Sequence, residues 1–307
     1  MVISQMAVLF IVLAVGYIAG KAKMITPDGN KMLSRIVLHI ATPCTLLGTV
    51  LSGNVNVSAG ETAFFLLMTI PVFLITFLIA IPAARMLFSK AGHSGRRQDR
   101  GMYCYMLVFG NVTFMGLPVT YAIFGPASAY YVALFNIPFL LLNFSAGIYM
   151  VSGKVGGLSP KTLITPAFIA ALVSIPVAIA GLSAPAVITD PVRLIGNMTT
   201  PGAMLVTGSA LSQISLKNVF GEWRLYPVAL LKLLVIPVIA WLALRPFVTN
   251  ELMLGMLVLL TAMPVAMAAS MLAYEYDGNE RIASSGIFLT TLLSCATIPL
   301  LVFLLLT

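Results

Sequence analysis

Charge is what this 307-residue sequence has least of: only 8% of its residues are Asp, Glu, Lys or Arg, whereas 60% are hydrophobic. Soluble domains carry about 25% charged residues, so the charged side chains here are too few to cover a water-facing surface of this size. The mean hydropathy of +1.05 points the same way. The composition excludes a soluble enzyme, a disordered chain and a nucleic-acid-binding protein. It predicts a chain that meets lipid over most of its surface.

Cysteine, histidine and buried acid are scarce as well. The three cysteines (Cys44, Cys104 and Cys295) lie in apolar runs without CxxC spacing, which predicts buried thiols and neither a disulfide framework nor a metal site. Only His39 of the two histidines lies inside an apolar segment, and no Asp or Glu lies in the middle of one. An intramembrane enzyme needs paired acids, a serine near a histidine, or a metal cluster. We therefore expect no enzymatic activity, no cofactor and no metal, with coupling to a proton or sodium gradient left open.

What the sequence has instead is long apolar runs. About 20 mostly apolar residues cross a bilayer as a helix, and the chain offers ten such segments joined by short connections. They cover approximately residues 2–20, 31–51, 62–88, 101–124, 127–150, 165–182, 190–211, 224–247, 252–274 and 281–305. The first is followed, not preceded, by Lys21 and Lys23, which favours a membrane span over a cleaved signal peptide. The sequence predicts an all-α polytopic membrane protein with ten transmembrane helices.

Basic residues are unevenly distributed among the connections between these segments. Numbered from the first, the odd connections contain 12 of the 17 Lys and Arg residues, and the even ones contain two, Arg193 and Arg245. Cytoplasmic loops of membrane proteins are enriched in Lys and Arg. The split predicts that both termini are extracytoplasmic and that the loop Lys90–Arg100 is cytoplasmic. The net charge of +8 then reports orientation rather than a polyanionic partner.

Two stretches of the chain resemble each other at a spacing of 158 residues. Four positions of the second segment recur in the seventh: Arg35 as Arg193, Thr42 as Thr200, Pro43 as Pro201 and Thr49 as Thr207. A repeat of five segments enters the membrane from opposite sides in its two copies, because five is odd. Such inverted repeats are typical of secondary transporters, which bind substrate near the midplane at interrupted helices. The predicted divisions are a first repeat at 1–150, a cytoplasmic linker at 151–164 and a second repeat at 165–307.

The fourth and ninth segments contain helix-breaking residues at corresponding places. The fourth reads Gly110-Asn-Val-Thr-Phe-Met-Gly-Leu-Pro118 and the ninth Thr261-Ala-Met-Pro264-Val-Ala-Met-Ala-Ala-Ser270. Gly, Pro and β-branched residues make a poor helix interior, and in lipid an interrupted helix is tolerated only inside protein or beside a wet cavity. Amides at the start of a half-helix attract anions, which favours a carboxylate substrate. The candidate substrate-binding residues are Gly110, Asn111, Thr113, Gly116, Pro118, Pro264, Ser270 and Lys232.

Lys232 is a charged residue inside the eighth apolar segment. It lies ten residues after Glu222, hence about 15 Å along a helix, and a buried ammonium group costs at least ~2.5 kcal/mol on insertion scales. We expect it to serve the transport unit as a counter-ion to substrate or as a stand-in for a coupling cation. The alternative is that it snorkels towards Trp223 and Tyr226 at the membrane interface.

Three further polar residues are possible accessory groups. His39 fits a proton relay, but a lone helix histidine is more often hydrogen-bonded structure. Asn136 and Asn143, seven residues apart, fit a cavity or equally well interhelical packing. Proline too has a structural alternative, since it often only kinks membrane helices; we favour kinking for Pro71, Pro82, Pro138 and Pro176.

The chain resembles the auxin efflux carrier family, which includes plant carriers and short bacterial relatives described as permeases of malonate or other organic acids. The residues that carry the resemblance span nearly the whole chain: Ala41-Thr-Pro43, GNVTFMGLP in the fourth segment, LLKLLVIP in the eighth, TAMPVAMAASMLAYEYDGN in the ninth, and Thr290, Thr291, Ser294 and Ile298-Pro299 in the tenth. The chain departs from the pattern of the plant carriers in two places. Gly110 replaces a proline that the plant carriers have before the asparagine, and the long cytoplasmic loop of many plant members is reduced to about Ser152–Thr165.

The resemblance implies a scaffold of helices 1, 2, 6 and 7 and a transport domain of helices 3–5 and 8–10. It also implies that the broken helices 4 and 9 cross, that access alternates by an elevator-type motion, and that the protein forms a homodimer through the scaffold. Substrate carboxylates would lie by the crossover, which matches Gly110, Asn111 and Pro264. A short chain of this type implies a bacterial cytoplasmic (inner) membrane.

The leading hypothesis from these observations is a secondary transporter for a small organic anion. It is motivated by the inverted repeat and the two broken helices. The alternative hypothesis is a passive anion channel or pore, which would conduct without saturation.

Overall fold

The computed structural model describes residues 2–53, 55, 57–88, 96–153, 164–214, 219, 221–276 and 278–306. Within these ranges the regular structure is helical and contains no β-strand, which confirms the all-α prediction. The helices fall into two compact units. Unit 1 comprises Met1–Leu67, Val112–Pro138 and Ser159–Gln213, and unit 2 comprises Met68–Asn111, Phe139–Leu158 and Ile214–Thr307. Much of the linker predicted at 151–164 and of the basic loop Lys90–Arg100 lies outside the described residues.

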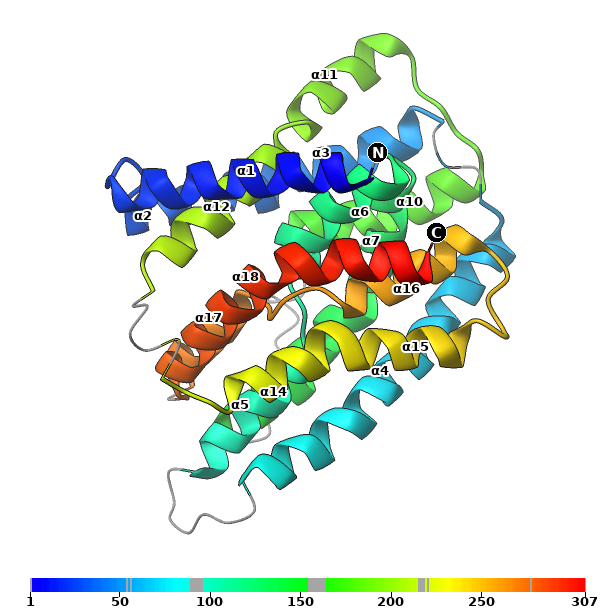
Figure 1. The fold of residues 1–307 in the computed structure, drawn as a ribbon. Coiled ribbons are helices and arrows are strands. Elements are labelled where there is room, and N and C mark those ends of the chain that lie inside the picture. The colour runs from blue at the N-terminus through cyan, green and yellow to red at the C-terminus, as the bar shows by residue number, and fades with distance from the viewer. Residues whose placement is uncertain are drawn as a thin grey trace. The chain divides into compact units, whose positions relative to one another are not determined.

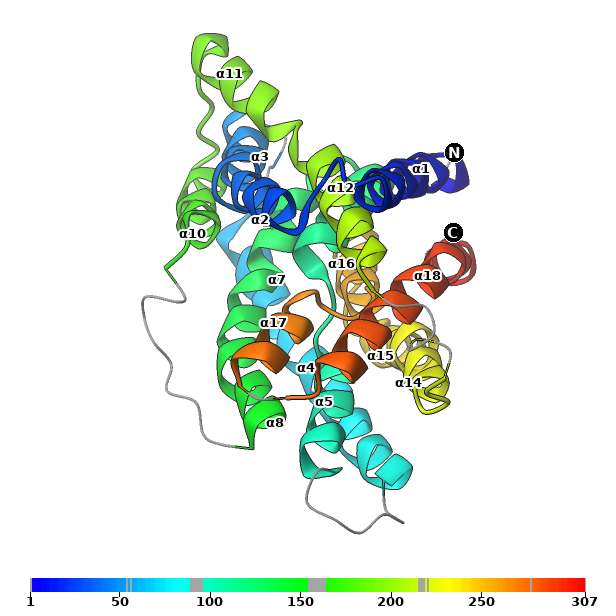
Figure 2. The same ribbon diagram turned by 90° about the vertical axis from the view of Figure 1, so that its left-hand side faces the viewer.

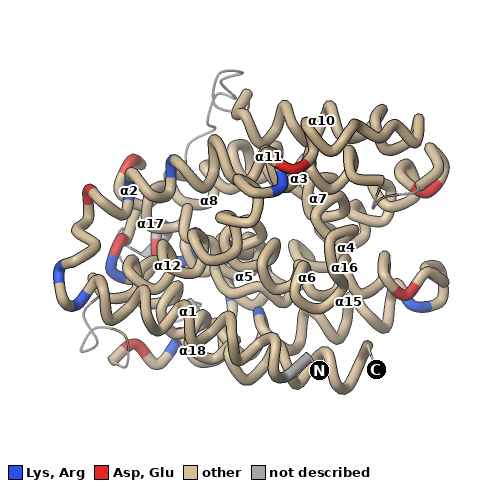
Figure 3. The backbone as a smooth tube through the Cα atoms, turned by 90° about the horizontal axis from the view of Figure 1, so that it is seen from above, with Lys and Arg blue, Asp and Glu red and all other residues tan. Residues whose placement is uncertain are grey.

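Six helices of the described chain are long and apolar enough to cross a membrane: Ser4–Lys21, Pro27–Leu51, Ala59–Leu87, Ser128–Ser152, Leu225–Leu244 and Glu280–Leu305. They correspond to the first, second, third, fifth, eighth and tenth predicted segments. Val112–Phe124, Pro166–Ile179 and Glu251–Thr261 are shorter apolar helices. Lys, Arg, Asp and Glu gather mainly in turns and near helix ends, with long uncharged stretches between them (Figure 3). The chain is therefore an integral membrane protein by composition and helix length, while the total of ten spans stays a prediction.

Unit 1 is a set of helices packed in pairs. α1 packs along α12, and α3 packs against both α10 and α11 (Figures 1 and 2). The unit's helices are α1 (Val2–Lys21), α2 (Pro27–Ile36), α3 (Thr42–Leu51), α6 (Leu117–Phe124), α10 (Pro166–Ile179), α11 (Ala186–Gly196), α12 (Thr199–Ser212) and the first parts of α4 (Ala59–Phe88) and α7 (Ser128–Leu142).

Small residues bring the backbones of α1 and α12 together. A β-carbon at Gly16 would lie 2.6 Å from the carbonyl oxygen of Leu205, and one at Gly208 would overlap the carbonyl oxygen of Leu13. Gly20 meets Ser212 in the same way, one turn along. Membrane helices associate closely where glycine and other small residues face each other at a spacing of four. This pair of helices holds unit 1 together through backbone contact.

The seventh predicted segment, 190–211, is not one helix. α11 ends at Gly196 and α12 begins at Thr199, with a turn at Asn197 and Met198. The hydroxyl of Thr45 on α3 donates to the carbonyl of Gly196 (2.8 Å) and lies 2.7 Å from the hydroxyl of Thr199. The prediction of a continuous span was wrong because the free carbonyl at this turn has a hydroxyl partner from another helix, which compensates the lost helical bond.

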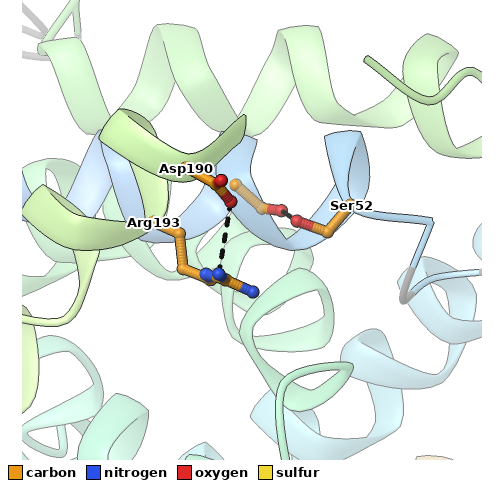
Figure 4. A network of polar contacts seen from close by, with 4 residues as sticks. Ser52, Asp190 and Arg193 are labelled. Atoms are coloured by element: carbon orange, nitrogen blue, oxygen red, sulfur yellow. Dashed lines mark hydrogen bonds and ion pairs between the residues drawn. The ribbon is translucent and has the colours of Figure 1, made fainter. Parts of the chain in front are cut away.

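The polar side chains at the ends of α3 and α11 bond locally (Figure 4). Asp190 and Arg193 form an ion pair at 3.2 Å, and the hydroxyl of Ser52 donates to the carbonyl of Gly48 at 2.6 Å. Both members of the ion pair are more than half exposed, and exposed pairs contribute at most about 1 kcal/mol. These local contacts add little to the stability of the fold.

Unit 2 contains residues 109–111 and 262–267, which interrupt two of the predicted segments. In it α5 packs against α8. α15 packs against α16, and α18 packs against α14 and α17 (Figure 1). Gly101 makes the α5–α8 contact possible, since a β-carbon there would overlap the carbonyl oxygen of Met150. The helices are α5 (Arg96–Val108), α8 (Ile148–Ser152), α14 (Leu225–Leu230), α15 (Ile236–Leu244), α16 (Glu251–Thr261), α17 (Ala268–Glu275), α18 (Glu280–Leu305) and the second parts of α4 and α7.

Across both units, the described residues contain four single π-helical turns: η1 (Val37–Ala41), η2 (Val112–Gly116), η3 (Asn143–Gly147) and η4 (Leu231–Val235). Three of them end two residues before a proline, namely Pro43, Pro118 and Pro237. A proline inside a helix lacks an N–H group and its ring crowds the carbonyl four residues earlier. A π turn widens the helix at that carbonyl, so it accommodates the ring without ending the helix.

Candidate functional site

The fourth predicted segment is interrupted at Gly110. α5 ends at Val108, residues 109–111 are not helical, and η2 begins at Val112. The interruption lies at the start of the stretch Gly110–Pro118 that the sequence indicates. Pro118 does not break the helix, because the π turn η2 directly before α6 accommodates its ring.

The ninth predicted segment is interrupted around Pro264. α16 ends at Thr261 and α17 begins at Ala268, so six residues between them lack helical structure. Pro264 cannot donate a backbone hydrogen bond. Both interruptions are buried, and Gly110 and Pro264 are among the buried residues.

The two interruptions bond to each other within unit 2. Gly110 and Val265 form an antiparallel bridge. The amide of Asn111 donates to the carbonyl of Pro264 at 2.7 Å, and the amide of Ala266 donates to the carbonyl of Phe109 at 3.0 Å. Backbone polar groups inside a membrane need partners within the protein, and here each broken helix supplies them for the other.

Gly110 suits this close approach. A β-carbon at this position would lie 3.2 Å from the carbonyl oxygen of Met263 and 3.3 Å from its β-carbon. Such contacts are tight enough that the neighbouring backbone would have to shift. A glycine therefore allows the bridge to form without displacing the second interruption.

Lys232 lies in the π turn η4 and is buried, with 1% of its surface exposed. Its Nζ atom donates to the carbonyl of Val108, the last residue of α5, at 3.3 Å. The snorkelling alternative is wrong for this structure, because the side chain turns into the protein. The carboxyl end of a helix carries partial negative charge, so the ammonium group stabilises the end of α5 directly before the first interruption.

No acidic side chain pairs with Lys232 among the described residues. The ion pairs in that part of the chain are Lys31–Asp28, Arg193–Asp190 and Arg224–Glu222. Lys232 is also the one charged side chain that is buried in the described ranges. The region beside the interruptions therefore holds a basic side chain that forms an ion pair with no carboxylate in the described part of the chain.

Thr290 is a residue of this region that the sequence did not single out as a site. Its hydroxyl oxygen accepts from the amide of Val265 at 3.0 Å and donates to the carbonyl of Gly286 at 2.7 Å. A threonine in an apolar helix ordinarily bonds only to its own helix. The contact with Val265 spans 25 residues, so no spacing rule in the sequence could reveal it.

The other predicted substrate-binding residues are not members of the bridge. Thr113, Gly116 and Pro118 belong to η2 and α6 of unit 1, where Thr113 is half-buried and the other two are buried. The carbonyl of Gly116 accepts from Thr120 within the same helix. Ser270 is half-buried on α17, with its hydroxyl 3.3 Å from that of Ser284. The structure thus brings Gly110, Asn111, Pro264 and Lys232 together in unit 2.

The three accessory residues have different surroundings. His39 is exposed on η1. Asn136 is half-buried on α7. Asn143 is buried, and its side-chain oxygen accepts from the hydroxyl of Tyr105 at 2.7 Å. This bond favours the interhelical-packing interpretation of Asn143 over a cavity residue.

Comparison with known proteins places the chain in a family. A family model described as "Membrane transport protein" matches residues 1–154 and 155–302. An uncharacterized transporter of Methanocaldococcus jannaschii is 26% identical over 302 residues, which cover 95% of this chain and 95% of that protein. An uncharacterized transporter of Methanothermobacter thermautotrophicus is 26% identical over 301 residues, which cover 96% of this chain and 95% of that protein.

These matches extend over nearly the whole chain, as do the motifs shared with auxin efflux carriers. They agree with a helical, lipid-facing composition and give no support to an enzyme. The chain belongs to the membrane transport protein family, that of the auxin efflux carriers, and is a membrane transporter rather than an enzyme.

Proposed function

We propose that this protein is a secondary transporter that moves a small organic anion, a carboxylate, across the cytoplasmic membrane. The observation that carries the proposal is the juxtaposition of two paired helix interruptions with the buried Lys232, which has no acidic partner among the described residues. Interrupted helices are where secondary transporters bind substrate. A buried, uncompensated ammonium group favours a substrate of negative charge.

The size of this preference follows from electrostatics. For a carboxylate assumed to bind about 8 Å from the ammonium group, an effective dielectric constant of ~20 gives an attraction of roughly 2 kcal/mol. That energy corresponds to about a 30-fold preference for a carboxylate over its neutral amide. The buried side chain of Asn111 supplies amide donors and a carbonyl acceptor at the first interruption, which adds directional recognition.

The mechanism belongs to the same proposal. Family membership supports helices 1, 2, 6 and 7 as a scaffold, helices 3–5 and 8–10 as a transport domain, crossing of the broken helices, and elevator-type alternating access. It also supports a homodimer through the scaffold. The division of the sequence into two inverted five-helix repeats underlies this arrangement.

Flux into proteoliposomes tests the function. The purified protein is reconstituted and uptake of labelled mono- and dicarboxylates is measured with imposed proton, sodium or potassium gradients. We expect saturable uptake of at least one carboxylate. Absence of flux for the whole panel under every gradient contradicts the proposal.

Single-channel recording separates the carrier from a passive pore. A carrier saturates and shows no unitary current, whereas a pore conducts without saturation. Unitary anion currents from the reconstituted protein would replace the carrier by the channel hypothesis.

A further inference from the structure

We propose that Thr290 is a positioning residue, which holds the second interruption on α18 so that it keeps its register with the first. The hydrogen bond from the Val265 amide to the Thr290 hydroxyl carries this proposal. The holding role follows from the geometry of unit 2 alone. Its consequence for transport rests on the proposed function.

The antiparallel bridge does not use the amide of Val265, which is therefore available to Thr290. The bonds from Asn111 to Pro264 and from Ala266 to Phe109 flank the Gly110–Val265 pair. Residues opposite each other in such a pair direct their own N–H and C=O groups away from each other. The Val265 amide therefore faces away from the first interruption and needs an acceptor elsewhere. Thr290 is that acceptor.

The orientation of the Thr290 hydroxyl is fixed by its own helix. Its proton goes to the carbonyl of Gly286 at 2.7 Å, which leaves a lone pair on the oxygen for the amide of Val265 at 3.0 Å. The side chain is buried, with 1% of its surface exposed, so water does not compete for the bond. A β-branched side chain has few rotamers in a helix, which keeps the acceptor in place.

The bond ties the interruption to α18 in addition to the covalent path. Along the chain, Val265 reaches α18 through α17 and the turn at Asn279, whose side chain caps the start of α18. The Thr290 bond closes this path into a ring. Residues 264–266 and α18 then move together. The position of α18 therefore determines where the Pro264 carbonyl lies relative to the Asn111 amide.

The neighbouring threonine gives a matched control. Thr291 is on the same helix and equally buried, and its hydroxyl has no hydrogen-bond partner among the described residues. Replacing either threonine by valine removes one hydroxyl at nearly constant volume. Thr290→Val removes the acceptor for Val265, Thr291→Val removes no such bond, and Thr290→Ser retains the hydroxyl.

Hydrogen–deuterium exchange of the purified protein in lipid nanodiscs is the test. We expect exchange in the peptide around Val265 and Ala266 to be at least tenfold faster in Thr290→Val than in the wild type, and unchanged in Thr291→Val and Thr290→Ser. Equal exchange in Thr290→Val and Thr291→Val would overturn the proposal.

Flux measurements with the same variants test the consequence for transport. We expect Thr290→Val to raise KM for the transported carboxylate several-fold, with KM restored in Thr290→Ser and unaffected in Thr291→Val. Faster exchange with an unchanged KM would overturn the positioning role. If the wild type transports no carboxylate, the proposed function fails, while the exchange comparison still decides whether Thr290 holds the interruption.

Discussion

Lys232 combines the properties of a structural and a functional residue. It is buried, it contacts the end of α5, and it pairs with no acid in the described chain. Removing this charge relieves its desolvation cost but also removes the hydrogen bond to the Val108 carbonyl, so the two effects on stability oppose each other. Stability alone therefore does not account for a charge at this position.

Replacing Lys232 by methionine is expected to lower carboxylate flux at least tenfold with only a small change in the thermal unfolding temperature in detergent. The loss of flux follows from the missing positive charge. The small change in stability is expected because methionine has a similar volume and relief of the desolvation cost opposes loss of the bond to Val108. Flux and unfolding are measured on the same preparation. Wild-type flux in Lys232→Met contradicts the assignment of this charge to transport.

Asn111 is expected to act through its side chain at the first interruption. Asn111→Ala leaves the backbone bond to Pro264 intact but removes the buried amide, so we expect flux to fall at least tenfold with little change in expression. Asn197→Ala, at an exposed turn, serves as the control and should transport normally. Equal flux in the two variants counts against Asn111 as a substrate ligand.

At the residue scale, the sequence drew attention to Lys232 and Asn111 but not to the contacts around them. Lys232 and Asn111 stand out because a charge and an amide are costly in an apolar segment. The carbonyl that Lys232 binds and the amide that Thr290 binds belong to other helices. Their identity depends on how the helices pack, which no local pattern encodes.

Helix boundaries, too, were predicted where a local pattern sets them and missed where a contact with another helix does. Apolar length predicted α4 and α18 closely, because runs of this length have one stable form in lipid. The break between α11 and α12 was missed, because a hydroxyl from α3 stabilises it. π turns precede Pro43, Pro118 and Pro237, and the helix continues through each of these prolines.

The contact between α1 and α12 is expected to depend on its glycines. Gly208→Ala places a methyl group against the backbone of α1, and overpacking of this kind costs about 1–3 kcal/mol. A lower unfolding temperature in detergent is the expected result. Gly60→Ala is the control, since its β-carbon would meet only the Ser58 hydroxyl, at 3.8 Å. A similar decrease of the unfolding temperature in both variants would show that the α1–α12 contact does not depend on Gly208.

At the scale of the whole molecule, charge distribution predicts orientation. In a variant lacking Cys44, Cys104 and Cys295, a cysteine at Ser4 should react with an impermeant maleimide in intact cells. A cysteine at Ser94, in the basic loop outside the described residues, should react only after permeabilisation. Labelling in the opposite pattern would reverse the predicted topology.

Under the proposed elevator mechanism, the buried ammonium group of Lys232 would make the transport cycle an electrical one. With a monovalent carboxylate bound, the charge on Lys232 and that on the substrate would cancel, so the loaded site would cross the membrane as a neutral pair. The empty site would carry its positive charge back unaccompanied. A membrane potential does about 2.3 kcal/mol of work per elementary charge for each 100 mV, so it would act on the return step. A voltage negative inside would then hold the empty site facing the cytoplasm, where it takes up an internal anion.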